Sequence, residues 1–265
     1  MSSQSPSPTT ASASTPGSPT LPTPVAHTYA SLTRTATYSF LAALPLLVFY
    51  EVGALLVNAD RAFAIRVGAD VWIKQFLARL GATGHLALAA VVLLIGIAVF
   101  VWERKKRLPL RPRYFAGMLL ESTLWGVLLA YLISGTIGAL FNGVVLGLPQ
   151  AAEPGKATML VLSLGAGLYE ELVFRVLLVG GLYLLARRVI GMERVAAYVG
   201  AALIGALLFS AVHYTGPYAD PLELPSFTFR FLFGLALNAL FLVRGFGIAA
   251  WTHALYDVMV VGFWS

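Results

Sequence analysis

Long apolar runs constrain this chain more than any other feature. Seven of them follow one another from residue 36 onward, and most are close to 20 residues long. A helix rises about 1.5 Å per residue, so about 20 residues cross the hydrocarbon core of a bilayer. Because lipid offers no hydrogen-bond partner to an open backbone, we expect every crossing to be helical. The runs lie at about 36–57, 84–103, 114–148, 157–186, 195–213, 228–243 and 246–264.

The composition also favours a membrane protein. Hydrophobic residues make up 58% of the chain and charged residues 11%, against about 25% charged residues in soluble domains. The sequence therefore predicts an all-α, polytopic bundle of seven or eight membrane-spanning helices in the inner (cytoplasmic) cell membrane. The run at 114–148 is too long for one simple crossing, and Gly135, Gly138 and Gly143 predict a bend, a re-entrant piece or two short helices there.

Two stretches differ from the apolar runs. Residues 1–28 are rich in Ser, Thr, Pro and Ala and contain no charged side chain, which is typical of a disordered tail. Residues 61–80 combine apolar positions at roughly helical spacing with interrupting charges, which predicts an amphipathic helix lying in the membrane interface. We therefore expect two parts, a tail at 1–28 and a membrane domain at 29–265.

The net charge of +6 comes from basic residues in short loops. Lys and Arg cluster at 103–113 and 187–194 and again at Arg244, which predicts that these three loops are cytoplasmic. The loops at 149–156 and 214–227 then face outward. This distribution indicates control of topology, and we expect no nucleic-acid partner. The absence of cysteine excludes disulfides, thiolate metal sites and a cysteine nucleophile.

Three ionisable side chains interrupt the fourth apolar run, in the stretch "EELVFR". Ionisable groups at membrane depth cost several kcal/mol and are functional candidates by default. Glu171 and Arg175 are four residues apart, so on a helix they share a face and can pair. A structural ion pair would explain these two residues but not Glu170, which projects about 100° around the helix from Glu171.

Two further polar clusters occur in later runs. His213 ends the stretch "FSAVH", and His253 and Asp257 lie four residues apart in "HALYD". A lone intramembrane histidine is more often a packing residue than a catalyst. Two histidines and extra carboxylates on three separate runs are, however, the groups that hold and activate a water, or that bind a metal such as zinc.

The ordered set E-E-x-x-x-R, F-x-x-x-H and H-x-x-x-(N/D) resembles the CPBP family of intramembrane proteases. That family includes the type II CAAX prenyl endopeptidases and the bacterial Abi proteins. The resemblance covers about the last hundred residues, whereas the first 150 match only as hydrophobic helices. Asp257 stands where many relatives have Asn, which adds a charge to the site.

The resemblance implies a role for each residue of the set. Glu170 would be the base that polarises a water, and His213 would act beside it on the water or the oxyanion. His253 and Asp257 would complete the polar cluster, and Glu171 and Arg175 would orient and neutralise it.

A zinc or other divalent ion is one expected cofactor, with Glu170, His213 and His253 as its ligands. The resemblance leaves a metal-independent, glutamate-dependent enzyme equally open. No H-E-x-x-H motif occurs, so the zincin arrangement is excluded.

The expected function is an intramembrane endopeptidase that cuts near the membrane anchor of a membrane-tethered or lipid-modified protein. Trimming of C-terminal anchoring signals of bacterial surface proteins is one such reaction. The expected partners are the anchored protein substrate and the bilayer. A proton-coupled transporter, or a non-catalytic immunity or scaffold protein, is the alternative.

Other polar or small residues have structural interpretations. Glu51 and Asn238 are expected to form interhelical hydrogen bonds, and Arg230 is expected to snorkel to the interface. Gly165 and Gly167, just before the first motif, predict close helix packing or a break in the helix.

Overall fold

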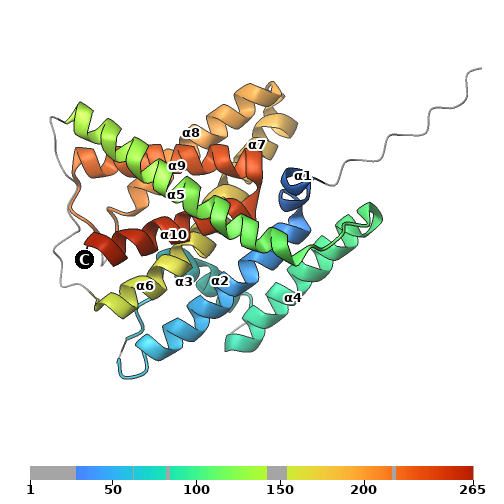
Figure 1. Cartoon of the computed structure of the whole chain (residues 1–265), viewed down its shortest axis with the longest axis horizontal. Helices are drawn as coiled ribbons and strands as arrows, with labels where there is room; N and C mark the ends of the chain where they lie inside the picture. The colour runs from blue at the N-terminus through green and yellow to red at the C-terminus, as the bar shows by residue number, and fades with distance from the viewer. Residues whose placement is uncertain (1–27, 62, 82–83, 142–153, 217–218, 265) are drawn as a thin grey trace, which may run out of the picture.

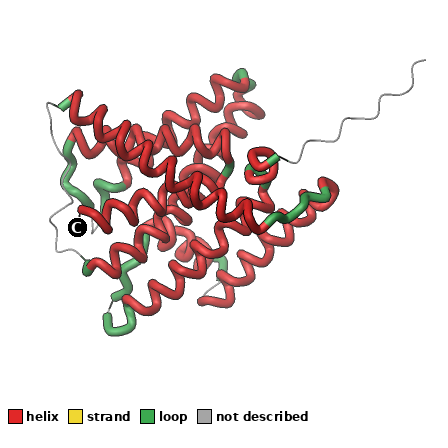
Figure 2. The backbone as a smooth tube through the Cα atoms, in the orientation of Figure 1, coloured by secondary structure: helices red, strands yellow, loops and turns green. Residues whose placement is uncertain are grey.

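The computed structural model describes residues 28–61, 63–81, 84–141, 154–216 and 219–264. These residues form helices joined by short loops, with no strand among them (Figures 1 and 2), which confirms the predicted all-α class. The predicted tail at 1–28 lies outside the described residues except for Thr28, which caps the first helix through its side-chain oxygen. The helices are α1 (Tyr29–Thr33), α2 (Ala36–Val57), α3 (Gly68–Arg79), α4 (Gly84–Glu103), η1 (Arg104–Lys106), α5 (Pro112–Leu140), α6 (Lys156–Gly165), η2 (Ala166–Glu170), η3 (Leu172–Val179), α7 (Gly180–Leu185), η4 (Ala186–Ile190), α8 (Arg194–Val212), α9 (Leu224–Arg244) and α10 (Phe246–Trp264).

Local signals at the helix ends explain these boundaries. The Thr35 side chain accepts a hydrogen bond from the backbone of α2, and Glu193 does the same for α8. Gly245 separates α9 from α10 with a φ of +85°, a conformation that glycine adopts without steric cost. The chain therefore reverses direction there within one residue, and the last two apolar runs become neighbours in space.

Helix α5 is one continuous helix of 29 residues. The helix runs through Gly135 and Gly138, so no re-entrant piece or pair of short helices forms at these two residues. A single glycine weakens a helix by only about 1 kcal/mol relative to alanine and leaves its hydrogen bonds intact. Gly143 lies outside the described residues. At about 1.5 Å per residue, α5 is about 44 Å long, which is enough for one tilted crossing.

The apolar run predicted at 157–186 forms one unbroken helical path from α6 to η4. The backbone stays right-handed α-helical at the junction residues 166, 171, 180 and 186. Between 166 and 179, and again at 186–190, the turns are π-helical. Such wider turns are rare and often occur at functional sites.

Four described helices, α2, α5, α8 and α9, are long and apolar enough to cross a membrane by length and composition, and α10 contains a shorter apolar helix. Large apolar side chains cover their outer faces, such as Leu56 (72% exposed) and Tyr131 (79% exposed). Buried against lipid, these side chains would leave no large apolar surface in water. The chain is a multi-pass membrane protein. The number of crossings, seven or eight, stays a prediction.

Helix α10 lies at the centre of the bundle. Figure 1 shows it between α5 and α9 on one side and α6 and α2 on the other, and it contacts all four. One apolar core joins α10 to α5, α8 and α9, and a second joins it to α2, α3 and η2. Polar groups on α10 are therefore held between two packed cores.

Helix α3 confirms the predicted helix within 61–80, but its charged side faces the bundle. Asp70 is fully buried, and Lys74 lies 2.8 Å from a carboxylate oxygen of Glu51 on α2. Trp72 and Phe76 are 45% and 61% exposed. The charges of α3 thus hold it to the protein, and its apolar side is left for the lipid.

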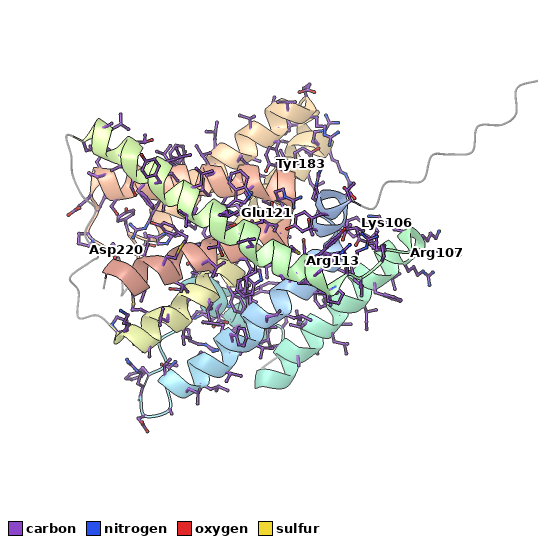
Figure 3. The ribbon with its side chains drawn as sticks, viewed as in Figure 1. Lys106, Arg107, Arg113, Glu121, Tyr183 and Asp220 are labelled. Carbon is purple, nitrogen blue, oxygen red and sulfur yellow. The ribbon has the colours of Figure 1, made fainter. Side chains whose placement is uncertain are left out.

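The three basic loops lie at one end of the bundle, and which side of the membrane that end faces stays a prediction. Figure 3 shows Lys106, Arg107 and Arg113 together at one end of α4 and α5, and Asp220 at the far end of the bundle. Because successive long helices run back and forth, the loops at 187–194 and 244–246 lie at the same end as the 104–113 loop (Figure 1).

Candidate active site

The two glutamates lie where their helix packs most closely against its neighbours. A Cβ on Gly165 would come within 2.3 Å of the Tyr50 ring, and a Cβ on Gly167 within 2.5 Å of the Ala250 carbonyl oxygen on α10. Neither approach is possible with a larger residue, which confirms the predicted close packing. The glycines therefore let the helix that carries Glu170 and Glu171 pack directly against α10, which carries His253.

Glu171 is the centre of a buried charged chain. Its Oε2 lies 3.0 Å from Nε of Arg175, and its Oε1 lies 2.8 Å from Nδ1 of His253. Glu171 is 0% exposed, Arg175 1% and His253 4%. An unpaired charge at such depth would cost several kcal/mol, so each of these groups depends on the others.

Asp257 extends this chain by one more group. One of its carboxylate oxygens lies 3.5 Å from Nε2 of His253, one helical turn away on α10. Both ring nitrogens of His253 thus face carboxylates, an arrangement that favours the doubly protonated imidazolium. The order of alternating charges is Arg175, Glu171, His253, Asp257.

Glu170 faces a different partner, His213 at the end of α8. Its Oε2 lies 3.9 Å from Nε2 of His213 and has no hydrogen-bond partner, although the atom is buried. The Nδ1 atom of His213 lies 2.8 Å from the Phe209 carbonyl oxygen. A carbonyl only accepts, so Nδ1 carries the hydrogen, and in the neutral ring Nε2 then presents a lone pair toward Glu170.

The gap between Glu170 and His213 therefore has an acceptor on each side. At 3.9 Å the two atoms are too far apart for a hydrogen bond, and two acceptors cannot bond to each other. A water molecule between them could donate one hydrogen to each, leaving its oxygen lone pairs free. Such a water is oriented as a nucleophile, with a carboxylate ready to take its proton.

Aromatic rings enclose the polar groups. The Phe209 ring lies edge-on to both histidines, with centroids 5.1 Å from His213 and 5.9 Å from His253. Phe233 on α9 closes the other side of His253 at 5.4 Å. The guanidinium of Arg175 stacks 4.5 Å above the Phe209 ring. Sequence reasoning missed Phe233, because a phenylalanine in an apolar run gives no signal of its own.

Arg230 does not snorkel to the membrane interface as the sequence predicts. Instead of snorkelling to the interface, its NH1 donates to Tyr214 at 2.7 Å and to Ser226 at 2.6 Å, and its NH2 pairs with Asp220. The Asp220 N–H in turn donates to the carbonyl of His213 at 3.0 Å. The arginine thus holds the loop that follows His213. It does not snorkel because Tyr214, Ser226 and Asp220 already accept hydrogen bonds from its guanidinium.

Tyr169, next to Glu170, links the site to α3. Its hydroxyl donates to Glu51 at 2.8 Å, and Glu51 also binds Arg66 at 2.6 Å and Lys74 at 2.8 Å. These contacts confirm interhelical hydrogen bonding by Glu51. Asn238 also bonds between helices, to the Ala202 carbonyl at 2.9 Å.

The three predicted metal ligands do not form one ligand set. Glu170 and His213 face each other, but both nitrogens of His253 are directed to carboxylates. Within the described residues, no group of three or more His, Asp or Glu side chains is arranged to hold a metal ion. A divalent metal stays a prediction.

All six predicted site residues thus lie in one region, where they form two neighbouring groups. Glu170 and His213 flank a gap, and Glu171, Arg175, His253 and Asp257 form the charged chain beside it. Such an arrangement suits the activation of a water inside an apolar bundle.

Comparison with known protein families finds a match in the same region of the chain as the site. No curated protein and no solved structure matches the sequence. Residues 153–259, which contain all six site residues, match the family model of the type II CAAX prenyl endopeptidases, Rce1-like. This part of the chain is therefore similar to the Rce1-like family, which is consistent with an intramembrane protease of the CPBP family.

Proposed function

We propose that the protein is an intramembrane endopeptidase in which Glu170 and His213 activate a water to hydrolyse a peptide bond. The observation that carries this proposal is the 3.9 Å gap between two acceptors, one of them a buried carboxylate oxygen without a partner. The match to the Rce1-like family supports the reaction class.

In the proposed reaction, Glu170 takes a proton from the bridging water as the oxygen attacks the peptide carbonyl. The C–N bond then breaks, and the proton passes from Glu170 to the leaving amine. General acid–base catalysis of this kind contributes about 10²- to 10⁴-fold in rate. His213 holds the water through Nε2, and Phe209 fixes the ring through its carbonyl.

The imidazolium of His253 supplies positive charge near the site. Charge that is already in place when an oxyanion develops stabilises the transition state at little reorganisation cost. Glu171 and Arg175 hold His253 in its orientation, and Asp257 offsets its charge on the other side. We assign these three as positioning residues.

We further propose that the substrate is a protein tethered to the membrane and cut close to its anchor, in the inner cell membrane. His213 and the Asp220 loop lie at the end of the bundle opposite the basic loops (Figure 3). If the basic loops are cytoplasmic, the site opens away from the cytoplasm. Exported proteins with C-terminal anchoring helices then fit better than cytosolic prenylated tails.

The test compares protein termini in membranes and medium of cells that carry the native chain, Glu170→Gln or Glu223→Gln. The first substitution keeps the shape and removes the base, and the second makes the same change in an exposed side chain that caps no helix. We expect defined termini to vanish and longer precursors to accumulate with Glu170→Gln only. If all three strains give the same termini while the variants are present at native levels, the proposal fails.

Metal dependence is decided by a separate measurement on the purified protein. We propose that the hydrolytic step needs no metal, so EDTA should leave the rate unchanged. Loss of activity in EDTA that zinc restores would contradict this proposal and show that a divalent metal takes part.

A further inference from the structure

An apolar groove runs between α2 and α5, on a part of the bundle that the hydrolytic residues do not occupy. Its volume is about 520 Å³, within the range of roughly 300–1,000 Å³ typical of ligand sites. Leu41, Pro45 and Phe49 line it from α2, and Phe115 and Ala116 from α5. We call this feature the α2–α5 groove.

The sequence explains why the two helices do not close on each other here. Pro45 lies inside α2, where it removes a backbone hydrogen bond and its ring presses on the carbonyl of residue 41. Ala42 and Ala116 contribute only methyl groups to the walls. The indole of Trp251 on α10 also lines the groove, and its nitrogen donates to the Ala42 carbonyl at 2.7 Å. The groove is thus built into the packing of three helices.

One end of the groove is fastened to the basic loop. Tyr38, one turn before Leu41, stacks on Phe115 with centroids 5.1 Å apart. The Tyr38 hydroxyl donates to the Pro109 carbonyl at 2.8 Å and accepts from the Arg111 N–H at 2.9 Å. The chain from Pro109 to Arg111 is therefore bound to Tyr38 of α2 directly before α5 begins.

That loop carries a large uncompensated positive charge. Of the six basic residues between 104 and 113, all of which the structure describes, only Lys106 has an ion pair, with Glu103. Figure 3 shows Lys106, Arg107 and Arg113 projecting from the same end of α4 and α5. Arg111 and Arg113 lie closest in sequence to the groove wall. Both guanidinium groups lie over the Tyr114 ring, and Arg111 also donates to the Tyr114 hydroxyl at 2.7 Å, but neither pairs with an acid.

An apolar groove at membrane depth that ends at arginines without an acidic partner matches one kind of molecule. We propose that the α2–α5 groove binds an anionic phospholipid, with an acyl chain along Pro45, Ala116 and Trp251 and the phosphate at Arg111 and Arg113. A zwitterionic lipid would bring its own cation to the same arginines. The charge of the loop therefore selects for an acidic headgroup.

The test measures lipid retention by native mass spectrometry of the full-length chain in detergent. Phosphatidylglycerol and phosphatidylcholine with identical acyl chains are added in turn. We expect the native protein to retain phosphatidylglycerol at concentrations where phosphatidylcholine is lost. Inorganic phosphate in excess should not displace it, because the acyl chain contributes to binding.

Matched variants separate the two halves of the site. Arg111→Gln with Arg113→Gln should weaken retention of phosphatidylglycerol about 30-fold, from roughly 1 kcal/mol for each basic residue near an anionic headgroup. Arg188→Gln with Arg194→Gln removes the same charge from another loop and should have no effect. Ala116→Trp should fill the groove and abolish retention, whereas Leu120→Trp, on the exposed face of α5, should not.

Three results would overturn the proposal. The first is equal retention of the two lipids by the native protein. The second is a loss with the Arg188 and Arg194 pair that equals the loss with the Arg111 and Arg113 pair. The third is full retention by Ala116→Trp. Thermal unfolding of each variant in the same detergent identifies any that fails to fold, and Ala116→Leu then replaces Ala116→Trp.

Discussion

Gly167→Ala should separate the helix of the two glutamates from α10. The added methyl group would lie 2.5 Å from the Ala250 carbonyl oxygen, 2.5 Å from the Ala254 Cβ and 2.6 Å from the Ala254 nitrogen. Ordinary contacts begin near 3.4 Å, so the helices must move apart by about 0.9 Å. Two of the three atoms belong to the backbone and the third is an alanine Cβ, so none of them can rotate away.

The expected cost follows from overpacking of a close-packed interior. Such insertions typically destabilise by about 1–3 kcal/mol, which corresponds to roughly 2–12 °C in Tm for a chain of this size. Activity should fall further than stability, since Glu171 would move from His253 and the 2.8 Å hydrogen bond between them would lengthen.

The assay is thermal unfolding of the purified protein in detergent, with Gly181→Ala as the control. Gly181 lies on the same helical path, and a Cβ there would meet nothing within 4 Å. That control should be neutral or up to about 1 kcal/mol more stable, because alanine favours a helix over glycine. If the two variants unfold within 1 °C of each other, the close approach of the two helices is wrong.

Three further predictions follow from the buried charges. Arg175→Met leaves Glu171 buried beside one fewer cation and should cost about 3–5 kcal/mol by thermal unfolding; adding Glu171→Gln should recover part of this loss, and no recovery would contradict the pairing. Glu51→Gln weakens the contacts that hold α3, so hydrogen exchange at 68–79 should accelerate at least tenfold, with exchange in α8 unchanged as the internal control. Asp220→Asn loosens the loop after His213 and should lower the hydrolytic rate more than the affinity for substrate, and rates identical to the native protein would show that Arg230 holds the loop without it.

The sequence predicts much of this fold because its dominant signal is simple. Helix α2 spans 36–57 and α4 spans 84–103, as the apolar runs predict. The helix and its caps are local features, and lipid enforces helical hydrogen bonding in each run. At Gly135 and Gly138 the local signal is ambiguous. A glycine can break a helix or sit within it, and only its neighbours decide.

The candidate site was predictable as a set of residues but not as an arrangement. The spacing of Glu171 and Arg175 predicts their pairing, and the structure confirms it. Nothing local predicts that His253 turns one nitrogen to Glu171, or that His213 turns its lone pair to Glu170, because both contacts join helices more than 40 residues apart. The partners of Arg230 were missed for a similar reason, since Asp220 and Tyr214 lie in a loop without a regular pattern.

The central claim is that Glu170 activates a water held between its carboxylate and His213. The most direct test is the rate of peptide-bond hydrolysis by purified Glu170→Gln on a substrate identified from lost termini, relative to Glu223→Gln and the native chain. We predict a fall of about 10²- to 10⁴-fold for Glu170→Gln, at an unchanged Tm, and a native rate for Glu223→Gln. A Glu170→Gln protein that is folded and hydrolyses the substrate within tenfold of the native rate would contradict the account.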